Sequence, residues 1–276
     1  MTESTRLAYL RSSATIGNAL LVGIRFNASG DAASLLLDIT LFYPQGGGQP
    51  YIHLLILDAT QGKVPQEKIS NNEMLPTGDP LNSTVEHVIG DAEQRTTAQK
   101  LVPLLPLPVT LRIDHDRRFL NSRLHTAGHL LDIVLIEIMG LSLTTGKAYH
   151  FPDGPHVLYR GQLVFKDKTG PTRDLATQIP HTRDEFLLLV EQHCNKIIRA
   201  DPLTIIRHAS PHDDYAMRCM SIDGFISEIP CGGTHVPHLG LLGPMMRVRK
   251  VQVKSGDNTT RISYNLDPIP NELNKN

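Results

Sequence analysis

Two short histidine-containing segments offer side chains that can chelate a metal ion. HTAGH places His125 and His129 four residues apart, so both imidazoles would lie on one face of an α-helix. CGGTH places Cys231 and His235 four residues apart, around glycines that permit a sharp turn. Imidazole and thiolate together suit zinc. We therefore predict that these four residues hold one zinc ion.

Four protein ligands restrict what such a metal can do. They are typical of a structural zinc, whereas a catalytic zinc generally keeps one position for water or substrate. For such a metal to activate water, one ligand would have to loosen or the coordination number would have to increase. Otherwise the metal would orient the substrate rather than ionise water. Zinc peptidases share the H-x-x-x-H spacing but have a glutamate after the first histidine. Thr126 takes that position here, which argues against such a peptidase.

The second unusual segment, TLFYPQGGGQP (40–50), contains three consecutive glycines. Backbone N–H groups of Gly46, Gly47 and Gly48 can face a ligand because no side chains shield them. Gln49 offers both a hydrogen-bond donor and an acceptor. A hairpin turn explains the same composition equally well. The spacing fits neither a dinucleotide-binding fingerprint nor a P-loop.

These chemical groups need elements that position them, and the first hundred residues are predicted to be mostly short strands. Gly, Pro, Asn and Asp clusters separate apolar or alternating runs at 19–26, 34–42, 51–58, 84–90 and 109–114. This spacing favours a small barrel or sandwich. The proline-rich segment 101–110 is predicted to be an extended crossing into a second domain.

The second half has helical as well as strand patterns. Apolar residues at helical spacing predict a helix from Asp116, as its cap, to Gly140. Thr182 and Glu185 fit the capping box of a helix over 183–199. Strand-like runs follow at 203–208, 247–253 and 260–266.

The predicted fold class is therefore α+β, in two domains. Residues 1–110 form a small β-barrel that carries the glycine motif. Residues 111–276 form an α+β domain with an antiparallel sheet and a metal-bearing helix.

The overall composition favours a folded protein and argues against membrane-spanning, disulfide-rich and secreted proteins. Hydrophobic residues make up 40% of the 276, so we expect a folded protein, and no apolar run is long enough to cross a membrane. Three cysteines argue against a disulfide framework, and the N-terminus does not look like a secretion signal, so cytoplasmic residence is expected. The net charge of −1 gives no overall attraction to nucleic acid.

Four ordered segments resemble the AlaX-type trans-editing proteins, which are similar to the editing domain of alanyl-tRNA synthetases. They are DITLFYPQGGGQP, RLHTAGHLLD, GKAYHFPDGP and FISEIPCGGTHV, spanning residues 38–236. The threonyl-tRNA synthetase editing module shares CGGTH after an H-x-x-x-H helix, whereas FYP-x-GGGQP is typical of the alanyl branch. The family commonly continues GGGQP with Asp and Gly; here YIHLL follows.

The resemblance implies zinc-dependent, ATP-independent hydrolysis in trans of mischarged tRNA, chiefly Ser-tRNA(Ala) and secondarily Gly-tRNA(Ala). It implies zinc at His125, His129, Cys231 and His235. Thr40 would discriminate the amino acid by bonding the serine hydroxyl, and Gln49 would support developing charge. Gly46, Gly47 and Gly48 would face the substrate. Lys147 is a candidate for contact with substrate or tRNA, and a surface position on a loop explains it equally well. A monomer is favoured.

Several residues and functions remain as alternatives. His150 is a candidate for contact with substrate or tRNA, and so is a group of arginines that is equally consistent with a solvated face: Arg112, Arg117, Arg118 and Arg123. The alternative function is a catalytically silent tRNA-binding or regulatory protein with a structural zinc. An unrelated zinc hydrolase is disfavoured by Thr126.

Overall fold

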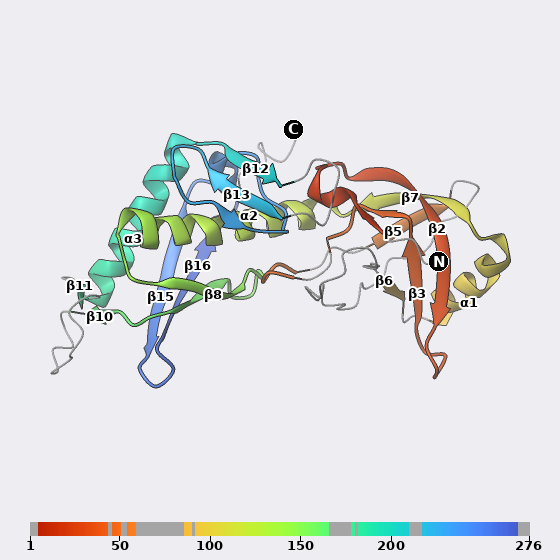
Figure 1. The fold of residues 1–276 in the computed structure, drawn as a ribbon, viewed down its shortest axis with the longest axis horizontal. Helices are drawn as coiled ribbons and strands as arrows, with labels where there is room; N and C mark the ends of the chain where they lie inside the picture. Colours follow the sequence, from red (N-terminus) through yellow and green to blue (C-terminus); the bar gives the residue numbers. More distant parts are fainter. Residues whose placement is uncertain are drawn as a thin grey trace. The chain divides into compact units, whose positions relative to one another are not determined.

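The computed structural model describes residues 5–43, 46–50, 54–58, 86–89, 92–165, 178–179, 182–209 and 217–269. These residues fall into two compact units, coloured along the chain in Figure 1. Residues up to Gly46 and from Pro50 to Phe119 belong to the first unit. Gly47–Gln49, Leu120–His208 and the residues from Met217 onward belong to the second. The glycine motif is therefore divided, with Gln49 in the second unit.

The first unit is built on a five-stranded antiparallel sheet in the order β5-β7-β2-β3-β6. Its strands are β2 (Ile16–Phe26), β3 (Ala33–Leu37), β5 (Leu54–Asp58), β6 (Glu86–Ile89) and β7 (Leu107–Ile113). A short parallel pair, β1 (Arg6–Leu7) with β4 (Ile39–Thr40), accompanies it. Within the described residues β5 and β6 are unpaired edges, so the sheet is open. The predicted barrel is not found.

Apolar side chains on one face of this sheet form the core of the first unit. Ala19 and Leu21 of β2 are buried while Leu20 and Val22 between and beside them are exposed, as strand alternation requires. Leu37, Phe42 and Leu111 complete the centre of this core.

The predicted crossing at 101–110 is wrong. Helix α1 (Ala92–Leu101) leads into a 3-10 turn (Val102–Leu104), and β7 then begins at Leu107 inside the sheet. Among the described residues β5 pairs with Val109–Ile113, so at Pro108 the described pairing of β7 is with β2 alone, a position where a proline is tolerated. Helix α1 was not predicted because, apart from buried Ala98, it has little apolar periodicity.

Helix α2 (His115–Asp132) contains His125 and His129, and it continues as a π-helical segment (Ile133–Ile138). The Asp114 carboxylate accepts a hydrogen bond from the Arg117 N–H at 3.0 Å, so the cap is Asp114 and not Asp116. Gly140, at φ 63°, follows the helical end as predicted.

A four-stranded antiparallel sheet in the order β15-β16-β9-β8 organises the second unit. Its strands are β8 (Thr144–Tyr149), β9 (His156–Arg160), β15 (Met246–Lys254) and β16 (Thr259–Leu266). Tyr159 and Tyr264 reach from one face of this sheet to α2, through hydrogen bonds of 2.7 Å to Asp132 and 2.8 Å to the Leu124 carbonyl. That face is therefore covered by helix.

Helix α3 (Arg183–Ala200) packs beside β15, where the Asn195 amide bonds the Met246 backbone. The predicted capping box between Thr182 and Glu185 is confirmed. A second antiparallel sheet, β12 (Thr204–His208), β13 (Arg218–Ile222) and β14 (Ile229–Pro230), leads into the CGGTH segment. The remaining elements are a parallel pair, β10 (Val164–Phe165) with β11 (Gln178–Ile179), and a 3-10 turn (Leu239–Leu242).

The mixed fold with antiparallel sheets agrees with the predicted class. None of the described helices has the length and apolar character needed to cross a membrane.

Candidate metal centre

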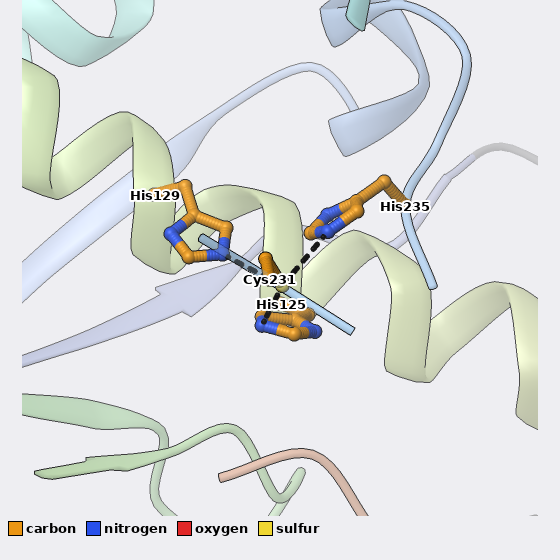
Figure 2. A group of neighbouring side chains, drawn as sticks. All are labelled: His125, His129, Cys231 and His235. Carbon is orange, nitrogen blue, oxygen red and sulfur yellow. Dashed lines mark hydrogen bonds between the residues drawn. The ribbon is translucent and has the colours of Figure 1, made fainter. Parts of the chain in front are cut away.

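Helix α2 and the CGGTH segment place four ligand-type side chains together, as Figure 2 shows. One ligand atom from each of His125, His129, Cys231 and His235 lies within 4.8 Å of the others. Cys231 Sγ is 3.5 Å from His125 Nε2, 3.4 Å from His129 Nε2 and 3.2 Å from His235 Nε2. Tetrahedral donors around zinc are roughly 3.5 Å apart. The donor set and its spacing fit a metal ion of that kind.

Gln49 fixes the tautomer of the neutral His125 ring. Its Oε1 accepts from the Thr234 N–H at 3.0 Å, and its Nε2 donates to Thr234 Oγ1 at 2.8 Å. Because a backbone N–H can only donate, the atom facing it must be the oxygen. The same oxygen lies 2.6 Å from His125 Nδ1, which must therefore carry the proton. The Nε2 lone pair of His125 is left to face the cluster.

The other two histidines also have partners behind them. Thr126 Oγ1 is 3.2 Å from His235 Nδ1 and accepts from the Val236 N–H. Asp132 Oδ2 is 3.5 Å from His129 Nδ1, too far for a full hydrogen bond but close enough for electrostatic attraction. Such partners orient metal-binding imidazoles and raise their basicity.

Arg218 holds the CGGTH segment in shape. Its Nη1 donates to the carbonyls of Cys231 at 2.7 Å and Gly233 at 2.8 Å, and its own carbonyl accepts from the Cys231 N–H. Gly233 must lack a side chain, because a Cβ there would overlap the His125 ring and come within 2.8 Å of Gln49 Oε1. The glycine thus lets the loop lie directly on the helix.

Electrostatics in the cluster favour a thiolate. Burial raises the pKa of Cys231, but the neighbouring imidazoles of His125 and His235 lower it more, so it lies well below the usual range. Burial lowers the pKa of His235 to about 3. Burial also lowers the pKa of His129, but Asp132 and Cys231 outweigh it and raise the pKa overall. Metals bind deprotonated ligands, so Cys231 and His235 are ready to coordinate.

His150 lies against the cluster, with its ring centroid 4.7 Å from that of His125. The Tyr264 hydroxyl donates its only proton to the Leu124 carbonyl, so His150 Nδ1, 2.7 Å away, must donate to Tyr264. Nε2 therefore keeps its lone pair, and no described residue bonds to it. Burial keeps the pKa of His150 well below its ordinary value. Gly128 makes room for this ring, since a Cβ there would overlap it.

The glycine motif contributes to this unit mainly through close packing. Gly48, at φ +80°, lies against the Ala148 backbone, and its carbonyl accepts from the His150 N–H at 2.7 Å. Gln49 is fully buried, and its oxygen is occupied by the two donors described above. Gly47, which precedes Gly48, also has a positive φ, of 53°. These contacts tie the motif to β8 and to His125.

Lys147, Thr40 and Gly46 are the remaining predicted substrate contacts. Lys147 is exposed on β8 in the second unit. Thr40 and Gly46 belong to the first unit. Thr40 is fully buried and accepts from the Phe42 N–H, while the Gly46 carbonyl accepts from the Tyr43 hydroxyl. The predicted roles of these three residues stay predictions.

Two arginines suggested as phosphate contacts are instead buried structural residues. Arg118 donates to the Leu41 carbonyl within the first unit. Arg123 donates to the carbonyls of Leu242 and Asp267 at 2.6 and 2.8 Å within the second. Both lie in the first half of α2, near the helix start as predicted, but their guanidinium groups bond backbone carbonyls rather than facing solvent.

Several supporting residues escaped the sequence analysis. Asp132 follows His129 by one helical turn, so that spacing was a usable signal. Arg218, Tyr264 and Thr234 carry no comparable signal, because their partners come from distant segments.

Comparison with known proteins finds alanine–tRNA ligases. The chain is 29% identical to the ligase of Burkholderia cenocepacia over an alignment of 274 residues, covering 88% of this chain and 26% of the ligase. It is 25% identical to the ligase of Pyrococcus furiosus over 247 residues, covering 80% of this chain and 22% of that ligase. The chain spans about a quarter of the length of these curated relatives. No protein-family model matches the sequence. The similarity relates this chain to a segment of alanine–tRNA ligases.

Proposed function

We propose that this protein hydrolyses mischarged alanine-accepting tRNA in trans, with Ser-tRNA(Ala) as first substrate and Gly-tRNA(Ala) as second. The observation that carries the proposal is the oriented cluster of three histidines and one cysteine in a chain related to alanine–tRNA ligases. Cytoplasmic residence and a monomeric state remain part of this proposal.

The metal would be Zn²⁺, held by His125, His129, Cys231 and His235. Three imidazoles and a thiolate suit zinc, and each imidazole has a polar side chain behind it. When bound, the ion would supply positive charge beside the reacting ester. Gln49 then serves as a positioning residue for His125, and this role replaces charge stabilisation in our proposal.

Hydrolysis of the ester needs a positioned water molecule. Its oxygen bonds to the carbonyl carbon, and the bond from that carbon to the ribose oxygen breaks. One proton passes to the ribose oxygen, and the other leaves as the free amino acid's carboxyl group ionises. We assign to His150 Nε2 the hydrogen bond that orients this water, because no described residue bonds to that nitrogen and the His150 ring stacks on His125 of the cluster.

The direct test is deacylation of purified Ser-, Gly- and Ala-tRNA(Ala) by the zinc-loaded protein. We expect turnover of the seryl and glycyl esters, little of the alanyl ester, loss with chelator, and recovery with added Zn²⁺. Absence of turnover on all three esters would refute the hydrolase.

A catalytically silent tRNA-binding protein is the second candidate, favoured by one observation: four protein ligands typify a structural zinc. His125→Ala separates the two. A hydrolase would lose turnover and remain folded, whereas a protein with a structural zinc would lose its cooperative unfolding transition.

A further inference from the structure

The four-stranded sheet of the second unit has a second face that is rich in cationic side chains. Residues directly opposite each other on neighbouring strands share a face. Strand pairing defines three rows across this outer face: Lys250–Ser263–His156–Tyr149, Gln252–Arg261–Leu158, and Lys254–Thr259–Arg160–Thr144. The residues between them, such as Val251, Ile262 and Val157, are buried on the face that α2 and α3 cover.

The three rows contain no acidic residue. Lys250, Lys254 and Arg160 are exposed, and none of them has an ion-pair partner among the described residues. Arg261, in the middle row, lies 3.1 Å from His156 Nδ1. The protein as a whole has a net charge of −1. The positive charge of this face therefore comes from the placement of its cationic residues and not from the overall composition.

Aromatic rings stand at one end of the first row. Tyr149 stacks on Phe151, with ring centroids 4.4 Å apart and planes inclined by 13°. Tyr149 also stacks on His156 at 5.3 Å, and its hydroxyl donates to Asp153. All three rings are partly accessible. Cations beside partly exposed aromatic rings are the combination that binds single-stranded nucleic acid, through phosphate contacts and base stacking.

The outer face adjoins the candidate metal centre through β8. Tyr149 pairs with His156 on the outer face, while the next residue, His150, turns inward and stacks on His125. Among the described residues β8 is an edge strand of this sheet, so a chain that crosses the face past Tyr149 reaches the end of β8 that His150 follows.

We propose that this outer face binds RNA, with phosphates on Lys250, Lys254 and Arg160 and unstacked bases near the 3′ end on Tyr149 and Phe151. The proposal rests on the proposed function, which supplies the RNA class: a tRNA whose aminoacylated end enters the metal centre. This outer face would give a protein whose net charge is close to zero its affinity for tRNA.

Binding of uncharged tRNA(Ala) tests the surface independently of catalysis. The double variant Lys250→Glu and Lys254→Glu is compared with Lys196→Glu and Arg199→Glu, which changes the same charge on exposed positions of α3, against the opposite face. We expect the sheet variant to bind at least about tenfold more weakly, with a salt slope lower by about two, and the α3 variant to bind as wild type. Equal effects of the two variants, or wild-type binding by the sheet variant, would overturn the proposal.

A small ester substrate distinguishes the role of the outer face in RNA binding from the hydrolysis reaction itself. Seryl-adenosine ester has no phosphates to meet the outer face, so its hydrolysis should be unchanged in the sheet variant while the KM for Ser-tRNA(Ala) rises. Equal loss on both substrates would mean that the charges act on the metal centre, which also overturns the proposal. If no ester is hydrolysed by any protein yet tRNA binding depends on the sheet, the surface stands and the hydrolase fails.

Discussion

Gln49 Oε1 lies 2.6 Å from His125 Nδ1, although the two residues are 76 positions apart in the sequence. The oxygen is identified by the Thr234 N–H that donates to it, so the direction of the bond to His125 follows from chemistry. The glycine-rich segment therefore acts on the metal cluster through one amide side chain. Gly48, where a Cβ would overlap the Ala148 carbonyl oxygen, lies next to this fully buried amide.

Gln49→Leu tests this relationship. Loss of the acceptor behind His125 is expected to lower zinc affinity by about 10- to 100-fold, as for other partners of metal ligands. Gln49→Glu keeps the acceptor and should retain most of that affinity. Competition with a chromophoric chelator measures both. Unchanged affinity in the leucine variant would show that the contact does not support metal binding.

Gly233→Ala and Gly232→Ala form a matched pair. A methyl group at 233 would overlap the His125 ring, whereas at 232 nothing described lies within 4 Å. We expect the 233 variant to lose bound zinc and the 232 variant to keep it, as measured by metal content after dialysis. Equal zinc in both variants would mean that the loop relaxes without disturbing His125.

The four candidate metal ligands could be predicted because their geometry is local. His125 and His129 are one helical turn apart, and a glycine turn brings Cys231 near His235, so each pair is readable in its own segment. The joining of the two pairs was a chemical inference from ligand type, and the structure agrees with it.

The role of Gln49 could not be predicted in the same way. Its partners His125 and Thr234 lie 76 and 185 residues away, and no local periodicity encodes such contacts. The barrel was wrong for a similar reason: alternation predicts strands, but whether the edge strands meet depends on long-range pairing. Arg118 and Arg123 looked solvated because cationic residues usually are, yet backbone carbonyls at distant positions bind them.

Tyr264→Phe tests the assignment of His150. The hydroxyl accepts from His150 Nδ1 and donates to the Leu124 carbonyl, so its loss frees the ring and costs about 1 to 3 kcal/mol of stability. We expect lower turnover of Ser-tRNA(Ala) with unchanged zinc content, measured well below the melting temperature.

The conservative variant His150→Gln, which can still accept a hydrogen bond, should keep more turnover than His150→Ala. Equal turnover in the two His150 variants would remove the proposed acceptor role.

The Glu137 carboxylate anchors the segment that leads to Cys231, and its contribution to stability depends on pH. Its carboxylate accepts from the N–H groups of Ile226 and Ser227 and from the Ser227 hydroxyl, at 3.0, 3.1 and 2.6 Å, a few residues before Cys231. Burial raises the pKa of Glu137, but these donors lower it more, to below its ordinary value of 4.5. A lowered carboxyl pKa stabilises the folded state above the unfolded pKa, and that contribution is lost as pH falls through the folded pKa.

Glu137→Gln should therefore be less stable than wild type at neutral pH, with a difference that shrinks below pH 4.5. Urea unfolding of the metal-free proteins over a pH series measures this difference without interference from zinc binding. Asp223→Asn is the control, because Asp223 is an exposed acid in the same part of the chain and none of these three donors bonds to it. A difference between Glu137→Gln and wild type that stays constant across the series would mean that the carboxylate charge does not hold the loop. A difference confined to neutral pH, absent in the Asp223 variant, would assign it to the three hydrogen bonds that anchor the approach to Cys231.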